Sequence, residues 1–168
     1  MYNGYGPRND LAIVITKDEI EFNARVNKVT LPVKSYFDLL GTSADKLTEL
    51  TGWGYFDITH KASNELRQAE LMVLDESFCI KIFKNEKIQE RLLERNIFCA
   101  ASYDAWSCGG DSGSPRVQGK TLVGILHGSK RKYCNFTLER TPSLFANVIQ
   151  DENMAFILKW MRVVDQLD

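Results

Sequence analysis

One glycine-rich stretch constrains this chain more than any other part of its sequence. It runs from Trp106 to Pro115 and reads WSCGGDSGSP. Glycines on both sides of Ser112 let the backbone adopt positive φ and let a substrate carbonyl come close. Backbone N–H groups beside such a serine can converge on a developing oxyanion. The stretch predicts a nucleophile loop, and the alternative is an ordinary glycine-rich turn around a buried aspartate.

Length and charge bound the class of protein. The chain has 168 residues, with 21 basic and 22 acidic side chains and a net charge of −1. This length suits one domain or slightly more, and the charge balance lacks the basic excess of a nucleic-acid binder. No apolar run approaches the roughly 18 residues of a membrane span, and the first ten residues contain no apolar leader. We therefore expect neither a nucleic-acid partner nor a membrane span.

Hydrophobic periodicity predicts mainly short strands. The expected strands are Leu11–Thr16, Ile20–Val26, Leu66–Leu74, Thr121–Leu126 and Leu144–Ile149. A short helix is expected over Glu86–Arg95. Apolar residues at helical spacing after an acidic first turn predict a terminal helix over Asp151–Asp168, packed on the β-rich body.

The segment Cys108–Pro115 resembles the nucleophile motif of the chymotrypsin/trypsin-like serine proteases (peptidase family S1), with Ser114 where that family usually has glycine. Other segments resemble the same family in the same order along the chain. They are Asn9–Ala12, Thr30–Pro32, Gly52–Gly54, Leu66–Ala69 followed by Cys79, Cys99–Ala101, Leu122–Ile125 and the terminal helix with Trp160.

The resemblance implies an all-β fold, a chymotrypsin-like antiparallel β-barrel with a C-terminal α-helix. We expect the second barrel of that fold to be complete and the first to be represented only by its last strands. The expected division is 1–32 for the remnant of the first barrel, 33–46 for a connection, 47–150 for the second barrel and 151–168 for the helix.

The resemblance also assigns roles to individual residues. Ser112 would be the nucleophile, and Asp10 the carboxylate that orients a catalytic imidazole. The backbone N–H groups of Gly110 and Ser112 would form the oxyanion hole. Asp111 would be the buried aspartate that pairs with a new amino terminus after zymogen cleavage. No cofactor and no metal is implied.

Four cysteines allow two disulfides, and the resemblance implies the pairs Cys79–Cys99 and Cys108–Cys134. Disulfides point to an oxidising, extracellular compartment, although no signal peptide is expected in the chain itself. Reduced thiols or a metal site are the alternative, but the chain has no Cys-x-x-Cys spacing. Asn135 begins an N-glycosylation triplet.

The chain has two histidines, His60 and His127, and neither matches the family's catalytic histidine, which lies well upstream of the aspartate. His60 is expected on the surface. Without that base Ser112 is a weak nucleophile, so the sequence predicts that the chain by itself is inactive.

The substrate pocket departs from the trypsin pattern. Trp106 stands where trypsin-like members carry an aspartate, and Ser143 replaces a glycine on the pocket wall. His127 and Gly128 lie on the strand that borders the pocket. These changes predict a shallow or filled pocket and argue against a preference for lysine or arginine.

Three hypotheses follow for function. The first is a serine-type endopeptidase that acts on protein or peptide substrates and is missing its histidine segment. The second is a non-catalytic protease homologue that acts as a binding or regulatory module, with a protein inhibitor or a partner protease as its partner. The third is a truncated fragment.

Overall fold

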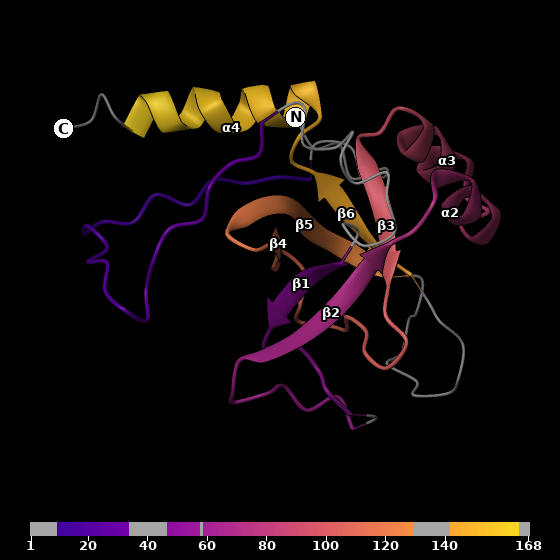
Figure 1. Cartoon of the computed structure of the whole chain (residues 1–168), viewed down its shortest axis with the longest axis horizontal. Coiled ribbons are helices and arrows are strands. Elements are labelled where there is room, and N and C mark those ends of the chain that lie inside the picture. The colour runs from indigo at the N-terminus through magenta and orange to yellow at the C-terminus, as the bar shows by residue number, and fades with distance from the viewer. Residues whose placement is uncertain (1–9, 34–46, 58, 130–141, 165–168) are drawn as a thin grey trace.

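The computed structural model describes residues 10–33, 47–57, 59–129 and 142–164. Its centre is a closed barrel of six antiparallel strands in the order β1-β2-β3-β6-β5-β4 (Figure 1). The strands are β1 Leu47–Gly52, β2 Arg67–Val73, β3 Ile97–Ala101, β4 Pro115–Gln118, β5 Thr121–Ser129 and β6 Ser143–Asn147. The prediction of an antiparallel β-barrel followed by a C-terminal helix is confirmed.

Strand β1 closes the barrel because it pairs on both of its edges. Leu50 lies opposite Ala69 of β2 and opposite Arg116 of β4. Inward-facing side chains of five strands, β1, β2, β3, β5 and β6, form the apolar core, because alternate residues of a strand face the same side. This cluster consists of Leu50, Leu71, Phe98, Ala100, Leu126 and Phe145. The rings of Phe98 and Phe145 stack with their centroids 5.4 Å apart.

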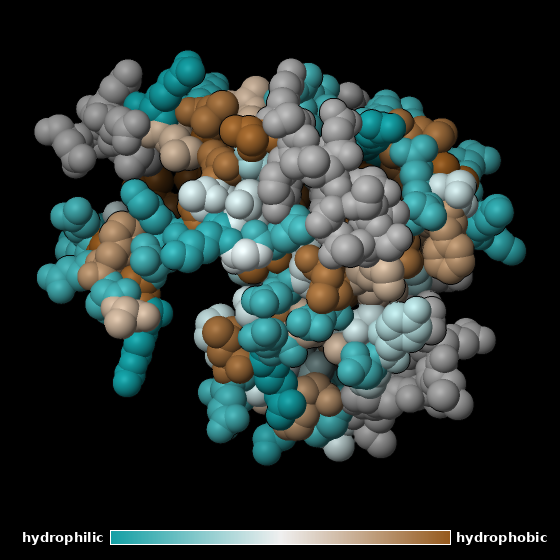
Figure 2. Space-filling model, in the orientation of Figure 1, coloured by the Kyte–Doolittle hydropathy of each residue, from teal (hydrophilic) through white to brown (hydrophobic). Residues whose placement is uncertain are grey.

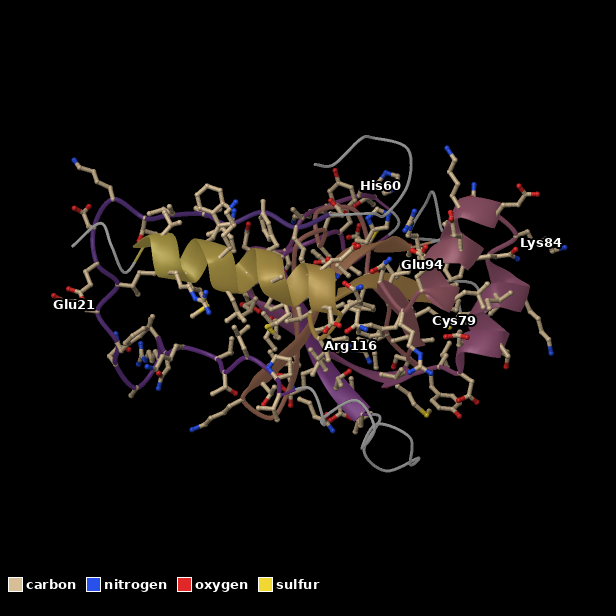
Figure 3. All side chains as sticks on the ribbon, turned by 90° about the horizontal axis from the view of Figure 1, so that it is seen from above. Glu21, His60, Cys79, Lys84, Glu94 and Arg116 are labelled. Atoms are coloured by element: carbon tan, nitrogen blue, oxygen red, sulfur yellow. A yellow bond between two sulfur atoms is a disulfide. The ribbon has the colours of Figure 1, made fainter. Side chains whose placement is uncertain are left out.

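An arginine also lies inside the barrel. Arg116 is fully buried, and its guanidinium lies 4.6 Å from the centre of the Phe145 ring (Figure 3). It hydrogen-bonds the Thr48 hydroxyl and, through Nη2, the carbonyl oxygen of Leu71 at 3.0 Å. The sequence did not single out this residue. An irregularity in the β4–β5 pairing between Arg116 and Val117 changes which side chains of β4 face inward.

Two helices cover the outside of the barrel between β2 and β3. They are α2 Glu76–Ile82 and α3 Glu86–Leu93. Helix α3 agrees with the expected helix over Glu86–Arg95, whereas α2 was not predicted. A second apolar cluster fills the space between the helices and the strands; it contains Cys79, Phe83, Leu92, Ile97, Cys99 and Leu144.

Helix α4, Asp151–Val164, agrees with the predicted terminal helix. It is attached to the barrel near its beginning, where Asn153 and Ile157 are buried. The Asn153 amide donates to the carbonyl oxygen of Asn147 at 2.8 Å. The helix then extends past the barrel (Figure 1), and hydrophobic side chains gather on its surface (Figure 2). The prediction that it packs along the β-rich body therefore holds only for its first turns.

The prediction of two strands before residue 33 was wrong. Leu11–Thr16 and Ile20–Val26 form no strand, and their apolar side chains are mostly exposed, with Val14 at 85%. A strand needs a hydrogen-bonded neighbour. The described structure pairs this segment only at Thr30, by an isolated bridge to Thr121.

Candidate active site

The glycine-rich stretch forms a tight loop between β3 and β4. The N–H of Asp111 donates to the carbonyl oxygen of Cys108 at 3.0 Å, and the N–H of Ser114 donates to that of Asp111 at 2.9 Å. Gly110 and Gly113 have φ of 94° and 85°, a region that side chains other than glycine rarely adopt. Two consecutive turns therefore carry Ser112 to an exposed position.

The carboxylate of Asp111 anchors this loop to the turn that follows β1. One oxygen accepts from the N–H of Gly54 at 2.8 Å, and the other accepts from the N–H of Cys108 at 2.9 Å. A Cβ atom at Gly52 or at Gly54 would overlap the carboxylate. The motif Gly52–Gly54 is therefore needed so that its backbone can approach Asp111. The N–H of Tyr55 donates to the carbonyl oxygen of Gly109 at 2.8 Å and adds a second link.

The N–H groups proposed for the oxyanion hole form no hydrogen bond within the described structure. The N–H groups of Asp111, Gly113 and Ser114 each donate to a backbone carbonyl oxygen. Those of Gly110 and Ser112 donate to no described atom. Two donors on either side of Asp111 are thus left for a ligand, which is the feature that oxyanion stabilisation requires.

The structure places the expected triad aspartate against a histidine. The Nδ1 atom of His127, on β5, contacts a carboxylate oxygen of Asp10. The two residues are 117 positions apart, so the sequence offered no signal for this pair. The hydroxyl of Ser112 forms no hydrogen bond with any described residue. The structure therefore joins Asp10 to His127 but does not join either residue to Ser112 by a hydrogen bond.

His60 lies elsewhere, in the connection between β1 and β2, where it is exposed (Figure 3). Its ring centroid is 5.4 Å from that of Tyr55. Of the two histidines, His127 contacts Asp10, whereas His60 lies against Tyr55.

A cavity of about 200 Å³ opens on the Asp111 side of the loop. Its lining includes Gly54, Tyr55, Arg67, Asp104, Trp106 and Asp111. Of the four residues predicted for the substrate pocket, Trp106 lines this cavity and Ser143, His127 and Gly128 do not. Ser143 is buried and shares a hydrogen bond of 2.6 Å with Ser107. Ser107 directly follows Trp106 in the chain, and Gly128 lies on β5 beside His127.

A disulfide joins Cys79 of α2 to Cys99 of β3. This is the first of the two pairs that the resemblance implies. Cys108 is also disulfide-bonded, while Cys134 and the glycosylation candidate Asn135 lie outside the described residues. No group of His, Cys, Asp or Glu residues in the described ranges could hold a metal ion. None of the helices there is long and apolar enough to cross a membrane.

The class of chymotrypsin-like serine hydrolase folds is defined by a closed antiparallel barrel that carries a Gly-Asp-Ser-Gly loop. Here Asp111 anchors that loop by hydrogen bonds, and two of its N–H groups donate to no described atom. Comparison with known proteins agrees with this class. The family model described as Trypsin matches residues 1–153, and the chain belongs to the trypsin family.

Individual relatives are similar over most of this chain. Trypsin eta of Drosophila melanogaster is 25% identical over 150 residues, covering 88% of this chain and 52% of its own length. Human granzyme M is 30% identical over 127 residues, covering 73% of this chain and 46% of its own length. The inactive CLIP domain-containing serine protease A8 of Anopheles gambiae is 29% identical over 133 residues, covering 74% of this chain and 35% of its own length. The chain spans between about a third and a half of these relatives.

Among solved structures, mouse brain neuropsin, a serine protease, shares the fold. Its TM-score is 0.67 at 24% sequence identity, and the match covers 86% of this chain and 58% of neuropsin. The likeness supports the barrel arrangement described above.

Proposed function

We propose that the chain is the nucleophile-bearing part of a serine-type endopeptidase that acts on protein or peptide substrates. One observation carries the proposal. The loop presents an exposed Ser112, and the N–H groups of Gly110 and of Ser112 itself donate to no described atom. In this reading Ser112 attacks the scissile carbonyl, and the two N–H groups stabilise the tetrahedral oxyanion.

Asp111 holds the loop in this form by its two backbone hydrogen bonds. By family resemblance it would also receive a protonated amino terminus, and the cavity beside its carboxylate offers room for one. The disulfide chemistry favours an extracellular place of action.

Hydrolysis of a peptide bond also needs an imidazole that takes the serine proton and returns it to the leaving amine. The family provides it from a segment upstream of the aspartate, and neither histidine of this chain stands there. We therefore expect the chain alone to turn over no peptide at the concentrations at which trypsin-like enzymes act.

A peptide boronic acid tests the nucleophile and the oxyanion hole without requiring turnover. Its boron accepts a serine oxygen and becomes tetrahedral, as the transition state does. We expect boron NMR to show a tetrahedral adduct with the wild-type chain and none with Ser112→Ala. Absence of the adduct from the wild type, with the chain folded by circular dichroism, would contradict the proposal.

The same reagent tests the pocket. A boronate with a small apolar side chain at the boron-bearing residue is expected to bind more tightly than one with a lysine-like side chain, because Trp106 stands where trypsin-like members carry an aspartate. Tighter binding of the lysine-like boronate would contradict the shallow pocket.

A second candidate function is that of a non-catalytic homologue that binds a protein inhibitor or a partner protease. The specific observation in its favour is that His127 engages Asp10, so the carboxylate is not vacant for an imidazole from elsewhere. The relative from Anopheles gambiae, named as inactive, adds support. Equal affinity of wild type and Ser112→Ala for a peptide boronate, without a tetrahedral signal, would favour this candidate.

A further inference from the structure

His127 and Ser112 stand on neighbouring segments that share backbone hydrogen bonds. The N–H of Gly113 donates to the carbonyl oxygen of Leu126 at 2.8 Å, and the N–H of Leu126 donates to that of Ser114 at 2.9 Å. Ser112 and His127 each adjoin one of these bonded residues. The regular pairing of β4 with β5 ends at Pro115 and Ile125, and these two hydrogen bonds extend the contact between the segments to the residues next to Ser112 and His127.

The contact with Asp10 also decides which ring nitrogen is left for chemistry. Nδ1 of His127 faces the carboxylate, so the tautomer with hydrogen on Nδ1 is favoured and the lone pair lies on Nε2. A Ser-His-Asp triad uses the two nitrogens in the same way: Nδ1–H faces the aspartate and Nε2 takes the serine proton.

We propose that His127, oriented by Asp10, is a general base for Ser112 and gives this chain an acyl-transfer activity toward activated esters. The proposal rests on the proposed role of Ser112 as nucleophile. It adds a catalytic residue at a position where the family does not place its histidine, and it names a substrate class that the chain can use by itself.

Acylation joins Ser112 to the ester carbonyl carbon and releases the leaving group. The Ser112 Oγ forms a bond to the ester carbonyl carbon, and its proton moves to Nε2 of His127. The resulting imidazolium is stabilised by the Asp10 carboxylate, and the tetrahedral oxyanion by the N–H groups of Gly110 and Ser112. The carbon–oxygen bond to the leaving group then breaks, and that group departs as a phenolate.

The nature of the leaving group explains why esters fit and peptides do not. An amine leaves only after protonation, so the imidazole must contact both the serine oxygen and the leaving nitrogen. A nitrophenolate leaves without a proton. A base placed on β5, beside the loop rather than at the family's position, needs only to reach Ser112.

The hydrogen bond from Ser112 to Nε2 is not formed in the described structure. Both sides of it can adjust, because Ser112 is exposed and the His127 side chain is one-quarter exposed. Catalytic hydrogen bonds commonly shorten only when substrate is bound. We expect this one to form as the ester carbonyl enters the oxyanion hole.

The test is the rate at which 4-nitrophenyl acetate acetylates Ser112, followed by mass spectrometry of the peptide that contains it. His127→Asn keeps an N–H that can face Asp10 but removes Nε2. His60→Asn is the matched control, because asparagine tolerates the positive φ of 56° at that position. Ser112→Ala gives the background of acetylation at other side chains.

We expect His127→Asn to slow acetylation of Ser112 by at least about 100-fold, within the range for loss of a general base, and His60→Asn to change it less than twofold. Equal rates for wild type and His127→Asn would overturn the inference, and so would a wild type that is not acetylated at Ser112. The boronate adduct separates the two proposals, since it requires Ser112 and the oxyanion hole but not Nε2. An adduct with His127→Asn would leave the proposed function intact.

Discussion

Among single residues, Gly110 has the largest positive φ in the loop, a backbone conformation that strongly favours glycine. Its φ of 94° is unfavourable for a side chain, and a Cβ would lie 3.2 Å from the Cα of Gly54. Gly110→Ala is therefore expected to strain the loop by about 1–3 kcal/mol and to displace the N–H that would face the oxyanion. We expect the affinity for a peptide boronate to fall by at least tenfold.

Gly119 provides the matched control for that substitution. Its φ is 57°, also positive, but a Cβ there would meet nothing within 4 Å. Gly119→Ala should destabilise the chain by about 1 kcal/mol and leave boronate affinity unchanged. Equal losses of affinity in both variants would mean that backbone strain alone, and not the position of the oxyanion donor, accounts for the effect.

Arg116 is a residue whose removal should stabilise the fold. Its Nη1 has no hydrogen-bond partner among the described residues, and a buried charge without a carboxylate carries a large desolvation cost. Methionine fills a similar volume, and the Leu71 carbonyl would keep its hydrogen bond from the Thr48 hydroxyl at 3.0 Å. We expect Arg116→Met to raise the free energy of unfolding by about 1–4 kcal/mol, measured by urea denaturation at pH 7.

The pH dependence of this gain has a definite sign. Burial lowers the pKa of Arg116 from the ordinary value of an arginine to about 9, so the unfolded chain holds this proton more tightly than the folded chain does. Below pH 9 both states are charged and the full cost is present. Above it the folded arginine loses its proton and the cost falls. The advantage of Arg116→Met should therefore shrink by about 1 kcal/mol between pH 7 and pH 10; a constant difference would contradict the assigned cause.

At the scale of elements, the Cys79–Cys99 disulfide fastens α2 to β3. Cross-linking residues 20 positions apart stabilises a fold by about 3 kcal/mol in the chain-entropy description. The double variant Cys79→Ala/Cys99→Ala should lose about this much in urea denaturation. Hydrogen exchange should show α2 opening first, because α2 is short and its buried residue is Cys79. An unchanged midpoint would show that helix packing alone holds α2 in place.

Local chemistry explains which elements could be predicted from the sequence. The loop around Ser112 was foreseeable because glycines and an aspartate specify it within a few residues, and α4 because its apolar spacing continues over 14 residues. Helix α2 has only seven residues, too few to show a helical repeat. Two features depend on distant parts of the chain: the contact of Asp10 with His127, and the inward position of Arg116 at the β4 irregularity.

The failed strand predictions before residue 33 have a related cause. Ile20–Val26 alternates apolar and polar residues as a half-buried strand does. Alternation shows only that one side of a strand would be apolar; a strand also needs a neighbouring strand with which to form hydrogen bonds. In the described structure the segment instead loops away from the barrel (Figure 1). It is fixed at Asp10 by His127 and near Thr30 by the hydrogen bond of the Thr30 N–H to the Lys120 carbonyl at 2.8 Å.

At the scale of the whole molecule, the barrel is a closed unit, whereas residues 10–33 leave a row of apolar side chains in solvent. Val14 and Phe22 are 85% and 58% exposed. Contiguous apolar surface of this kind promotes association, so we expect the chain to self-associate through this segment. Val14→Ser/Phe22→Ser should raise the concentration at which light scattering first detects aggregates by several fold.

The same double variant should leave the thermal midpoint nearly unchanged, because substitutions at exposed sites usually alter stability by less than about 0.5 kcal/mol. Leu66→Ser/Leu93→Ser is the matched control, since these side chains are 54% and 62% exposed but lie outside residues 10–33. If the control improved solubility equally, general surface hydrophobicity would explain the association. If only the first pair did so, the unpaired segment before residue 33 would be the surface through which the molecule meets another chain.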